Sequence, residues 1–169
     1  MSVSPEEVFA EVERRIARDP GVRLFTVLQW IPAIRTLRRV ASNRPAEYPL
    51  GAEKSLEVSG GWLDAVIRDR RTFLGAHDAD VAAVFADVEL IRSLGCGSVI
   101  NAPIVSDDRV VGVLAILDAD GAYDAAAVAT VERHAADLSA ELGAALGADL
   151  PAATPTPFTA PAPTAEESA

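Results

Sequence analysis

The first apolar residues of the chain recur every four positions, a spacing that gives a helix one apolar face; they are Val8, Val12 and Ile16. Ser4, Pro5 and Glu7 stand just before this stripe. A serine N-cap, a proline at the first helical position and a glutamate three residues after the cap form a typical helix start. The pattern predicts a helix from Pro5 that ends near residues 18–21, where an Asp-Pro-Gly sequence interrupts it.

Two stretches with alternating side chains predict a first β-hairpin. Residues 22–30 alternate in the way a strand requires, because successive side chains of a strand point to opposite faces. One of these faces is formed by Leu24, Thr26 and Leu28. Residues 34–42 are the expected partner strand.

A second hairpin is predicted from two strongly apolar stretches, residues 97–105 and 110–118. The turn between them contains Asp107 and Asp108. Short acidic side chains suit a turn because they can satisfy local backbone groups.

The segment between the two hairpins predicts a loop, several short helices and one short strand. Two prolines and a glycine interrupt residues 43–51, which predicts a loop. The elements that follow are a helix over 59–70, a short strand over 71–76 and one or two helices over 77–95. Asp78 or Asp80 can cap the last segment, and Gly95 can close it.

The last regular element is a predicted long helix that Asp124 can cap. Its apolar residues step by three or four and form one stripe, at Val128, Val131, Ala135, Leu138, Leu142 and Leu146. Such a stripe can pack on the sheet or on a second copy of the helix. Residues 149–169 are rich in Pro, Ala and Thr, so we expect a disordered tail after a domain over residues 1–148.

The order of elements predicts the fold class. Two hairpins separated by a helical crossover do not fit a doubly wound parallel sheet. They predict an α+β domain with one largely antiparallel sheet and helices outside it.

Charge and composition narrow the classes of partner. The chain has 169 residues and a formal net charge of -10, so we expect neither a nucleic acid nor a membrane surface as partner, because both attract clustered cations. The start has no apolar signal core and no stretch is long enough to span a bilayer, which predicts a cytoplasmic protein. A single cysteine excludes an internal disulfide and a multi-cysteine metal site.

One local cluster of cations stands against the acidic background, at Arg35, Arg38 and Arg39. In a regular strand Arg35 and Arg39 share one face and Arg38 takes the other. We expect these side chains to lie on a solvated outer face.

Three segments resemble the GAF domain family: "SGGWLDAVIRDRRTFLGAHDAD", "LGCGSVINAPI" and "DRVVGVLAILDADGAYD". The resemblance runs from about residue 5 to residue 148. It implies a layered fold with a central antiparallel sheet of about five or six strands, terminal helices on one face and crossover helices and loops on the other. It also implies a small-molecule cavity between the sheet and the crossover, and homodimers that form through the terminal helices.

The resemblance extends to the layout of free methionine-R-sulfoxide reductase, but the residues that this enzyme needs are missing. Trp62 stands where that branch is expected to carry a cysteine, and no cysteine precedes Cys96. Ala115 and Leu117 replace its expected carboxylates, so no resolving thiol or proton donor is available. The motif of cyclic-nucleotide-binding relatives is also absent, and Cys96 lacks the sequence context for bilin attachment. We therefore assign no catalytic residue, and the sequence does not identify a cofactor.

The two histidines do not indicate a metal site. His134 lies on the predicted last helix, where a solvated position is expected. His77 precedes Asp78 and Asp80 at a helix start, where such side chains serve as caps more readily than as ligands. Cys96, beside a glycine at a strand entrance, is expected to fill space.

A candidate ligand pocket can still be assembled from the predicted strands. Strand alternation places Val99 and Asn101 on one face. A buried Asn must find hydrogen-bond partners, and two explanations remain open: Asn101 bonds a neighbouring loop backbone, or it binds a polar group of a ligand. The further candidate ligand-binding residues are Tyr48, Trp62 and Phe73 around the ligand, with Val113 and Leu117 as an apolar floor.

Three functions from different classes fit these observations. The first is a binding or sensory module that recognises a small molecule, the second is an enzyme on this fold acting on a small aromatic or redox-active compound, and the third is a dimeric interaction protein with a filled pocket. The long apolar stripe of the last helix is the feature that supports the third.

Overall fold

The computed structural model describes residues 3–55 and 60–147. Its first helix, α1 (Pro5–Arg18), begins as the sequence predicts. The Ser4 hydroxyl oxygen accepts from the backbone N–H of Glu7, and the Glu7 carboxylate accepts from the backbone N–H of Ser4. This capping box satisfies two N–H groups that the helix itself cannot satisfy. The apolar stripe of α1 is buried.

The centre of the molecule is a six-stranded antiparallel sheet with the order β3-β2-β1-β6-β5-β4. Its strands are β1 (Leu24–Ile31), β2 (Thr36–Ser42), β3 (Glu53–Ser55), β4 (Phe73–Gly75), β5 (Ser98–Ser106) and β6 (Arg109–Asp118). Both predicted hairpins are present, and the predicted α+β class is confirmed. Asp107 and Asp108 form the β5–β6 turn with positive φ angles of 51° and 60°, as in a type I′ turn.

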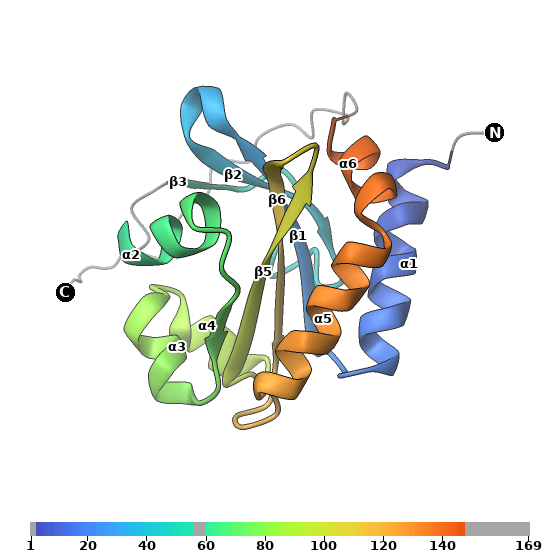
Figure 1. Ribbon diagram of the computed structural model, residues 1–169. Helices are drawn as coiled ribbons and strands as arrows, with labels where there is room; N and C mark the ends of the chain where they lie inside the picture. Colours follow the sequence, from blue (N-terminus) through green and yellow to red (C-terminus); the bar gives the residue numbers. More distant parts are fainter. Residues whose placement is uncertain (1–2, 56–59, 148–169) are drawn as a thin grey trace.

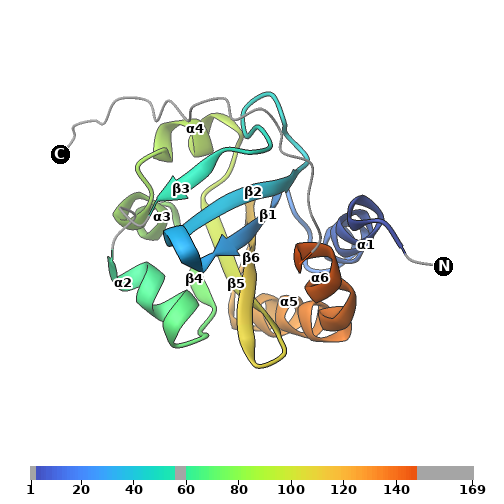
Figure 2. The same ribbon diagram turned by 90° about the horizontal axis from the view of Figure 1, so that it is seen from above.

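Helices cover both faces of the sheet (Figures 1 and 2). One face carries α1 with α5 (Ala125–Asp137) and α6 (Ser139–Gly147). The other face carries the crossover, which consists of α2 (Gly60–Leu63), a π-helical turn (Asp64–Arg68), α3 (Asp78–Val84) and α4 (Val88–Ser93). This arrangement gives the sheet two apolar layers, one under the terminal helices and one under the crossover.

The C-terminal helix differs from the prediction in its continuity. Asp124 caps it as expected, by accepting from the backbone N–H of Ala127, but the helix ends at Asp137 and α6 begins at Ser139. The predicted apolar stripe packs on the sheet of its own chain, with Val131, Ala135, Leu138, Leu142 and Leu146 all buried. The break lets both pieces follow the twisted sheet. Five of the six stripe residues are therefore buried within their own chain, and Val128 is partly buried against the same core.

The second strand corrects the prediction for the arginine cluster. Ile34 belongs to a short 3₁₀ turn (Pro32–Ile34). Arg35 follows this turn, is exposed and has a left-handed backbone conformation. A β-bulge pairs Val27 with Ala41 but Leu28 with Arg39, which turns Arg39 toward the crossover. Arg39 is only 4% exposed, so its expected solvated position is wrong. The three-residue strand β3 was also not expected from the sequence.

The predicted N-cap of α3, Asp78 or Asp80, is not the one that the structure has. Its N-cap is His77, and the predicted caps lie inside the first turn. The Asp80 carboxylate accepts from the backbone N–H of His77 at 3.0 Å, so Asp80 supports the helix start from within. Gly95, with a φ of 79°, follows the end of α4 as predicted. The predicted tail over residues 149–169 lies outside the described residues.

Candidate functional site

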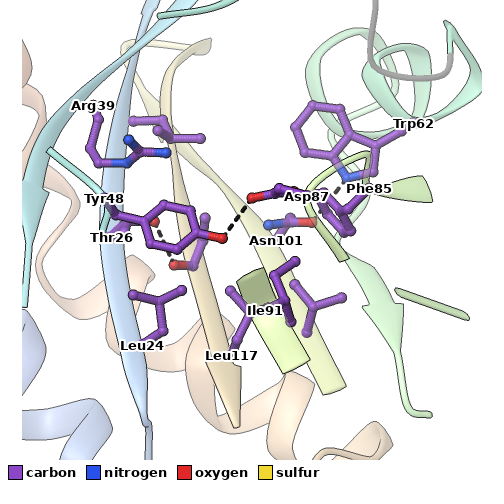
Figure 3. Close-up of a pocket in the computed structure, with 13 residues that line it drawn as sticks. Leu24, Thr26, Arg39, Tyr48, Trp62, Phe85, Asp87, Ile91, Asn101 and Leu117 are labelled. Atoms are coloured by element: carbon purple, nitrogen blue, oxygen red, sulfur yellow. Dashed lines mark hydrogen bonds between the residues drawn. The ribbon is translucent and has the colours of Figure 1, made fainter. Parts of the chain in front are cut away.

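A pocket lies between the crossover side of the sheet and the segments that cover it (Figure 3). The sheet contributes side chains from β1, β2, β5 and β6, and the cover consists of the loop after β2, α2 and the segment that leads into α4. Thirteen residues line it: Leu24, Thr26, Leu28, Arg39, Tyr48, Trp62, Phe85, Asp87, Ile91, Val99, Asn101, Ala115 and Leu117. The walls are mainly apolar, and a few polar groups converge inside them, which is the usual composition of a small-molecule site.

The cavity at the centre of these side chains is small. Its volume is about 30 Å³. A space of this size holds a water molecule or two, whereas sites for drug-sized ligands are roughly ten times larger or more. Any larger ligand therefore requires the cover to move away from the sheet.

Asn101 has a defined partner in this pocket. Its Oδ1 accepts a hydrogen bond from Trp62 Nε1 at 2.9 Å, and the two side chains are 2% and 5% exposed. Trp62 lies on α2, so the bond joins the crossover to β5. The partner of Asn101 Oδ1 is thus another pocket side chain, which neither of the two explanations from the sequence anticipated. The Trp62 ring also packs edge-on against Phe85 at a centroid distance of 6.5 Å.

A second hydrogen bond closes the pocket on the opposite side. The Tyr48 hydroxyl donates to Asp87 Oδ2 at 2.6 Å, which ties the loop after β2 to the N-cap of α4. Burial, the negative charge of Asp87 and this hydrogen bond all raise the pKa of Tyr48 above its usual range. The hydroxyl therefore stays protonated and keeps donating across the whole physiological pH range.

Arg39 is the buried cation of the pocket. Its Nη1 donates to the carbonyl oxygen of Pro49 at 3.2 Å, and its guanidinium carbon lies 4.8 Å from the centre of the Tyr48 ring. Its Nε is buried and has no hydrogen-bond partner. Burial lowers the pKa of Arg39, and the nearby Tyr48 and Asp87 oppose this effect. A buried donor without a partner costs free energy, so this position is one of the least satisfied in the domain.

The structure brings together five of the seven candidate ligand-binding residues. Tyr48, Trp62, Val99, Asn101 and Leu117 line the pocket. Two candidates do not line it. Phe73 packs beside it, with its ring edge-on to Phe85, and Val113 is fully buried in the neighbouring apolar cluster.

Eight further lining residues were not among the candidates. For Leu24, Thr26 and Leu28 the sequence carried a usable signal, because their alternation already placed them on one face of a strand. Ala115 stands in the predicted strand at the same face as Leu117. The other four depend on the β-bulge or on the fold of the crossover, and are Arg39, Phe85, Asp87 and Ile91.

The cysteine and the histidines take structural positions. Cys96 is buried in the apolar cluster under the crossover, and burial raises the pKa of its thiol to about 11. His134 Nε2 lies 2.9 Å from the carbonyl oxygen of Asp19. Across residues 3–55 and 60–147, no group of three His, Cys, Asp or Glu side chains is placed to hold a metal ion.

The sequence matches one family model over most of its length. The model describes the GAF domain and matches residues 4–142, which include the sheet, the pocket and both flanking layers. The chain belongs to the GAF domain family. No curated protein sequence matches it significantly.

Solved GAF domain structures share the fold at low sequence identity. A GAF domain/HD domain protein from Geobacter sulfurreducens superposes with a TM-score of 0.69 at 13% identity, over 87% of this chain and 97% of that one. The GAF domain of a two-component sensor histidine kinase from Bacillus halodurans gives 0.69 at 17% identity, over 85% and 96%. A red/green cyanobacteriochrome in its red light-absorbing state gives 0.63 at 16% identity, over 82% and 93%. Within the described part of this GAF domain, no helix has the length and apolar character to cross a membrane.

Proposed function

We propose that this GAF domain is a sensory or regulatory module that binds a small molecule in the pocket between its sheet and its crossover. The observation that carries the proposal is the set of polar side chains buried inside an apolar cavity, above all Arg39 with its unpartnered Nε. A domain that needed only a packed core would gain stability from an apolar side chain at this position. A ligand can compensate the cost of keeping the polar group there.

The cover of the pocket is the part that a ligand would move. Side-chain hydrogen bonds from Trp62 to Asn101 and from Arg39 to the Pro49 carbonyl oxygen attach it to the sheet, together with apolar packing. The bond from Tyr48 to Asp87 joins two segments of the cover to each other. Hydrogen bonds of this kind contribute about 1 kcal/mol each, so a ligand of moderate affinity can displace or rearrange them. The position of the cover then depends on whether the ligand is bound, which is what a sensory module requires.

The related structures support a sensory role. The sensor histidine kinase domain and the cyanobacteriochrome have the same fold as this chain. The chemistry of the pocket supports binding over turnover, since no Cys, His or Ser stands among the described residues that line it. The one thiol of the chain, Cys96, lies outside this lining, and burial raises its pKa to about 11.

We further propose that the module forms a homodimer through the outer sides of α1, α5 and α6. These helices lie on the sheet face opposite the crossover (Figure 2). The pocket lies on the crossover side, so a partner on these helices leaves its cover free to move. Val3, just before α1, is 59% exposed and adds an apolar contact at this face. Light scattering on the purified chain should give the mass of a dimer. A monomer mass at all concentrations would contradict this part of the proposal.

Native mass spectrometry of the chain purified from its own host tests ligand binding. We expect a fraction of the protein to carry an additional small molecule that leaves on collisional activation. Ala115→Met places a longer side chain in the pocket and should abolish this adduct, because Ala115 lines the cavity. Ala82→Met, at an exposed position of α3, is the matched control and should keep it. An adduct that survives in both variants, or is absent from all three proteins, would contradict the proposal.

A further inference from the structure

Arg39 makes its direct contacts in the pocket with neutral groups, and Asp87 acts on it only through its charge. The Pro49 carbonyl and the Tyr48 ring contact its guanidinium, and no carboxylate of the described residues forms an ion pair with it. The one acidic side chain of the pocket, Asp87, already accepts the Tyr48 hydroxyl hydrogen. A buried cation without an anionic partner is costly, and an anion that binds beside it gains the full strength of a charge-assisted hydrogen bond.

The geometry of the guanidinium favours a carboxylate. Nη1 donates to the Pro49 carbonyl oxygen, whereas Nε has no acceptor. The edge of the guanidinium that carries Nε is therefore the one left for a ligand. This side of an arginine binds the two oxygens of a planar carboxylate through parallel N–H groups. The Thr26 hydroxyl in the same lining is not a partner of Nε, and it donates to the carbonyl oxygen of Ala115 at 2.8 Å.

The charge and size of the pocket limit the ligand further. Arg39 is the only cationic residue among those that line it, and Asp87 lies in the same lining. The charge of Asp87 already offsets that of Arg39 and repels every further negative charge, so a ligand with two negative charges is disfavoured more strongly than one with a single carboxylate. The remaining walls are apolar, with Leu24, Ile91 and Leu117 around a cavity of about 30 Å³. These walls fit a short aliphatic chain.

We propose that the ligand of this pocket is a small monocarboxylic acid whose carboxylate binds Arg39 through Nε and whose apolar part packs on Leu24, Ile91 and Leu117. This inference rests on the proposed function, because it names the ligand class of the same pocket. Arg39 then acts as the specificity-determining residue, and the neutral analogue of the acid should bind much more weakly.

The two tryptophans of the chain provide a local readout for this proposal. Trp62 lines the pocket and its indole N–H is bonded to Asn101, whereas Trp30 does not line the pocket. Their two indole signals in a ¹⁵N-labelled protein are assigned with Trp30→Phe. Sodium acetate, propionate and butyrate are titrated against propionamide and propylammonium chloride, at constant ionic strength set by sodium chloride.

A carboxylate site predicts a saturable shift of the Trp62 signal with at least one of the three acids. Propionamide and propylammonium should bind at least about tenfold more weakly, which is the effect of losing one charge-assisted hydrogen bond. Arg39→Gln should weaken binding of the acid by a similar factor. Arg35→Gln removes the same charge from an exposed position and should leave binding unchanged. Arg39→Lys keeps a charge but lacks Nε, so it should bind more weakly than the wild type.

The possible failures are distinct. If propionamide shifts the Trp62 signal as strongly as propionate, the pocket binds small molecules but the carboxylate assignment is wrong, and the proposed function stands. If an acid binds equally well to Arg39→Gln, the role of Arg39 is wrong. If no probe moves the signal and native mass spectrometry finds no adduct, both the carboxylate site and the proposed function are contradicted. The comparison of acid with amide uses the wild-type chain, so it tests selectivity for a carboxylate even if an Arg39 variant does not fold.

Discussion

Trp62 on α2 donates its indole N–H to Asn101 on β5 at 2.9 Å, across 39 positions of sequence. Both side chains are almost fully buried, and the bond links the cover of the pocket to the sheet. Asn101 Oδ1 therefore has a structural role in the closed pocket, and this oxygen becomes fully available to a ligand when Trp62 moves away.

Asn101→Ala should destabilise the domain by about 1–3 kcal/mol, because it leaves the buried Trp62 N–H without an acceptor. Urea unfolding followed by circular dichroism measures the change in the free energy of unfolding. In a double-mutant cycle with Trp62→Phe, most of this cost should disappear in the background that lacks the indole N–H. Strictly additive effects of the two substitutions would show that the hydrogen bond contributes nothing.

The two tyrosines of the chain give the domain a pH limit on the alkaline side. The pKa values of Tyr48 and Tyr123 are both raised above the ordinary value of 10, in each case mainly by burial. Above about pH 10 the unfolded chain therefore loses tyrosine protons that the folded chain retains, so stability falls as the pH rises. Below that pH the contribution is fully present.

Absorbance at 295 nm measures this effect directly, since the chain has no other tyrosine. Phenolate should appear together with the loss of circular dichroism and not before it. Tyr48→Phe should halve the phenolate signal and reduce the alkaline loss of stability. Ionisation of both residues in a chain that stays folded near pH 10 would contradict their buried positions.

Gly112 on β6 should not tolerate a side chain. A Cβ at this position would lie 2.5 Å from the backbone oxygen of Leu28 and 2.8 Å from a methyl of Leu146. Gly112→Ala therefore has to separate β6 from β1 or displace α6, and we expect a loss of about 1–3 kcal/mol in the free energy of unfolding. Gly61→Ala is the control, because a Cβ there meets nothing within 4 Å and alanine favours a helix. Equal stability of the two variants would contradict the close approach of these elements.

Cys96 should react slowly with thiol reagents while the domain is folded. Its thiol is buried and its pKa is raised to about 11, so almost no thiolate is present near pH 8. The rate of alkylation by iodoacetamide should rise sharply in denaturant and follow the unfolding transition. Rapid labelling of the native chain would instead show that the thiol is accessible and reactive, which would contradict its buried position.

Local sequence patterns predicted the parts of the fold that local interactions determine. The capping box at Ser4 and the alternation of β5 and β6 around Asp107 and Asp108 require no knowledge of distant residues. The same alternation placed Val99 and Asn101 on the pocket side of the sheet. Five of the seven candidate pocket residues followed from these patterns together with the family resemblance.

The features that were missed depend on distant contacts. Arg39 faces the pocket because a bulge opposite Val27 and Leu28 shifts the register, and a regular alternation gives no sign of it. The bond between Tyr48 and Asp87 joins a loop to a helix start 39 residues away. The break between α5 and α6 lets one continuous apolar stripe follow the sheet, so the stripe itself does not reveal the break.

The most direct measurement is a crystal structure of the chain purified from its own host and crystallised without added carboxylates. We expect electron density for a small molecule between Arg39, Trp62 and Tyr48, with two oxygens facing the Arg39 guanidinium and an enlarged cavity. A pocket that contains only water, with the side chains closed as in Figure 3, would contradict the claim that this domain binds a small molecule there.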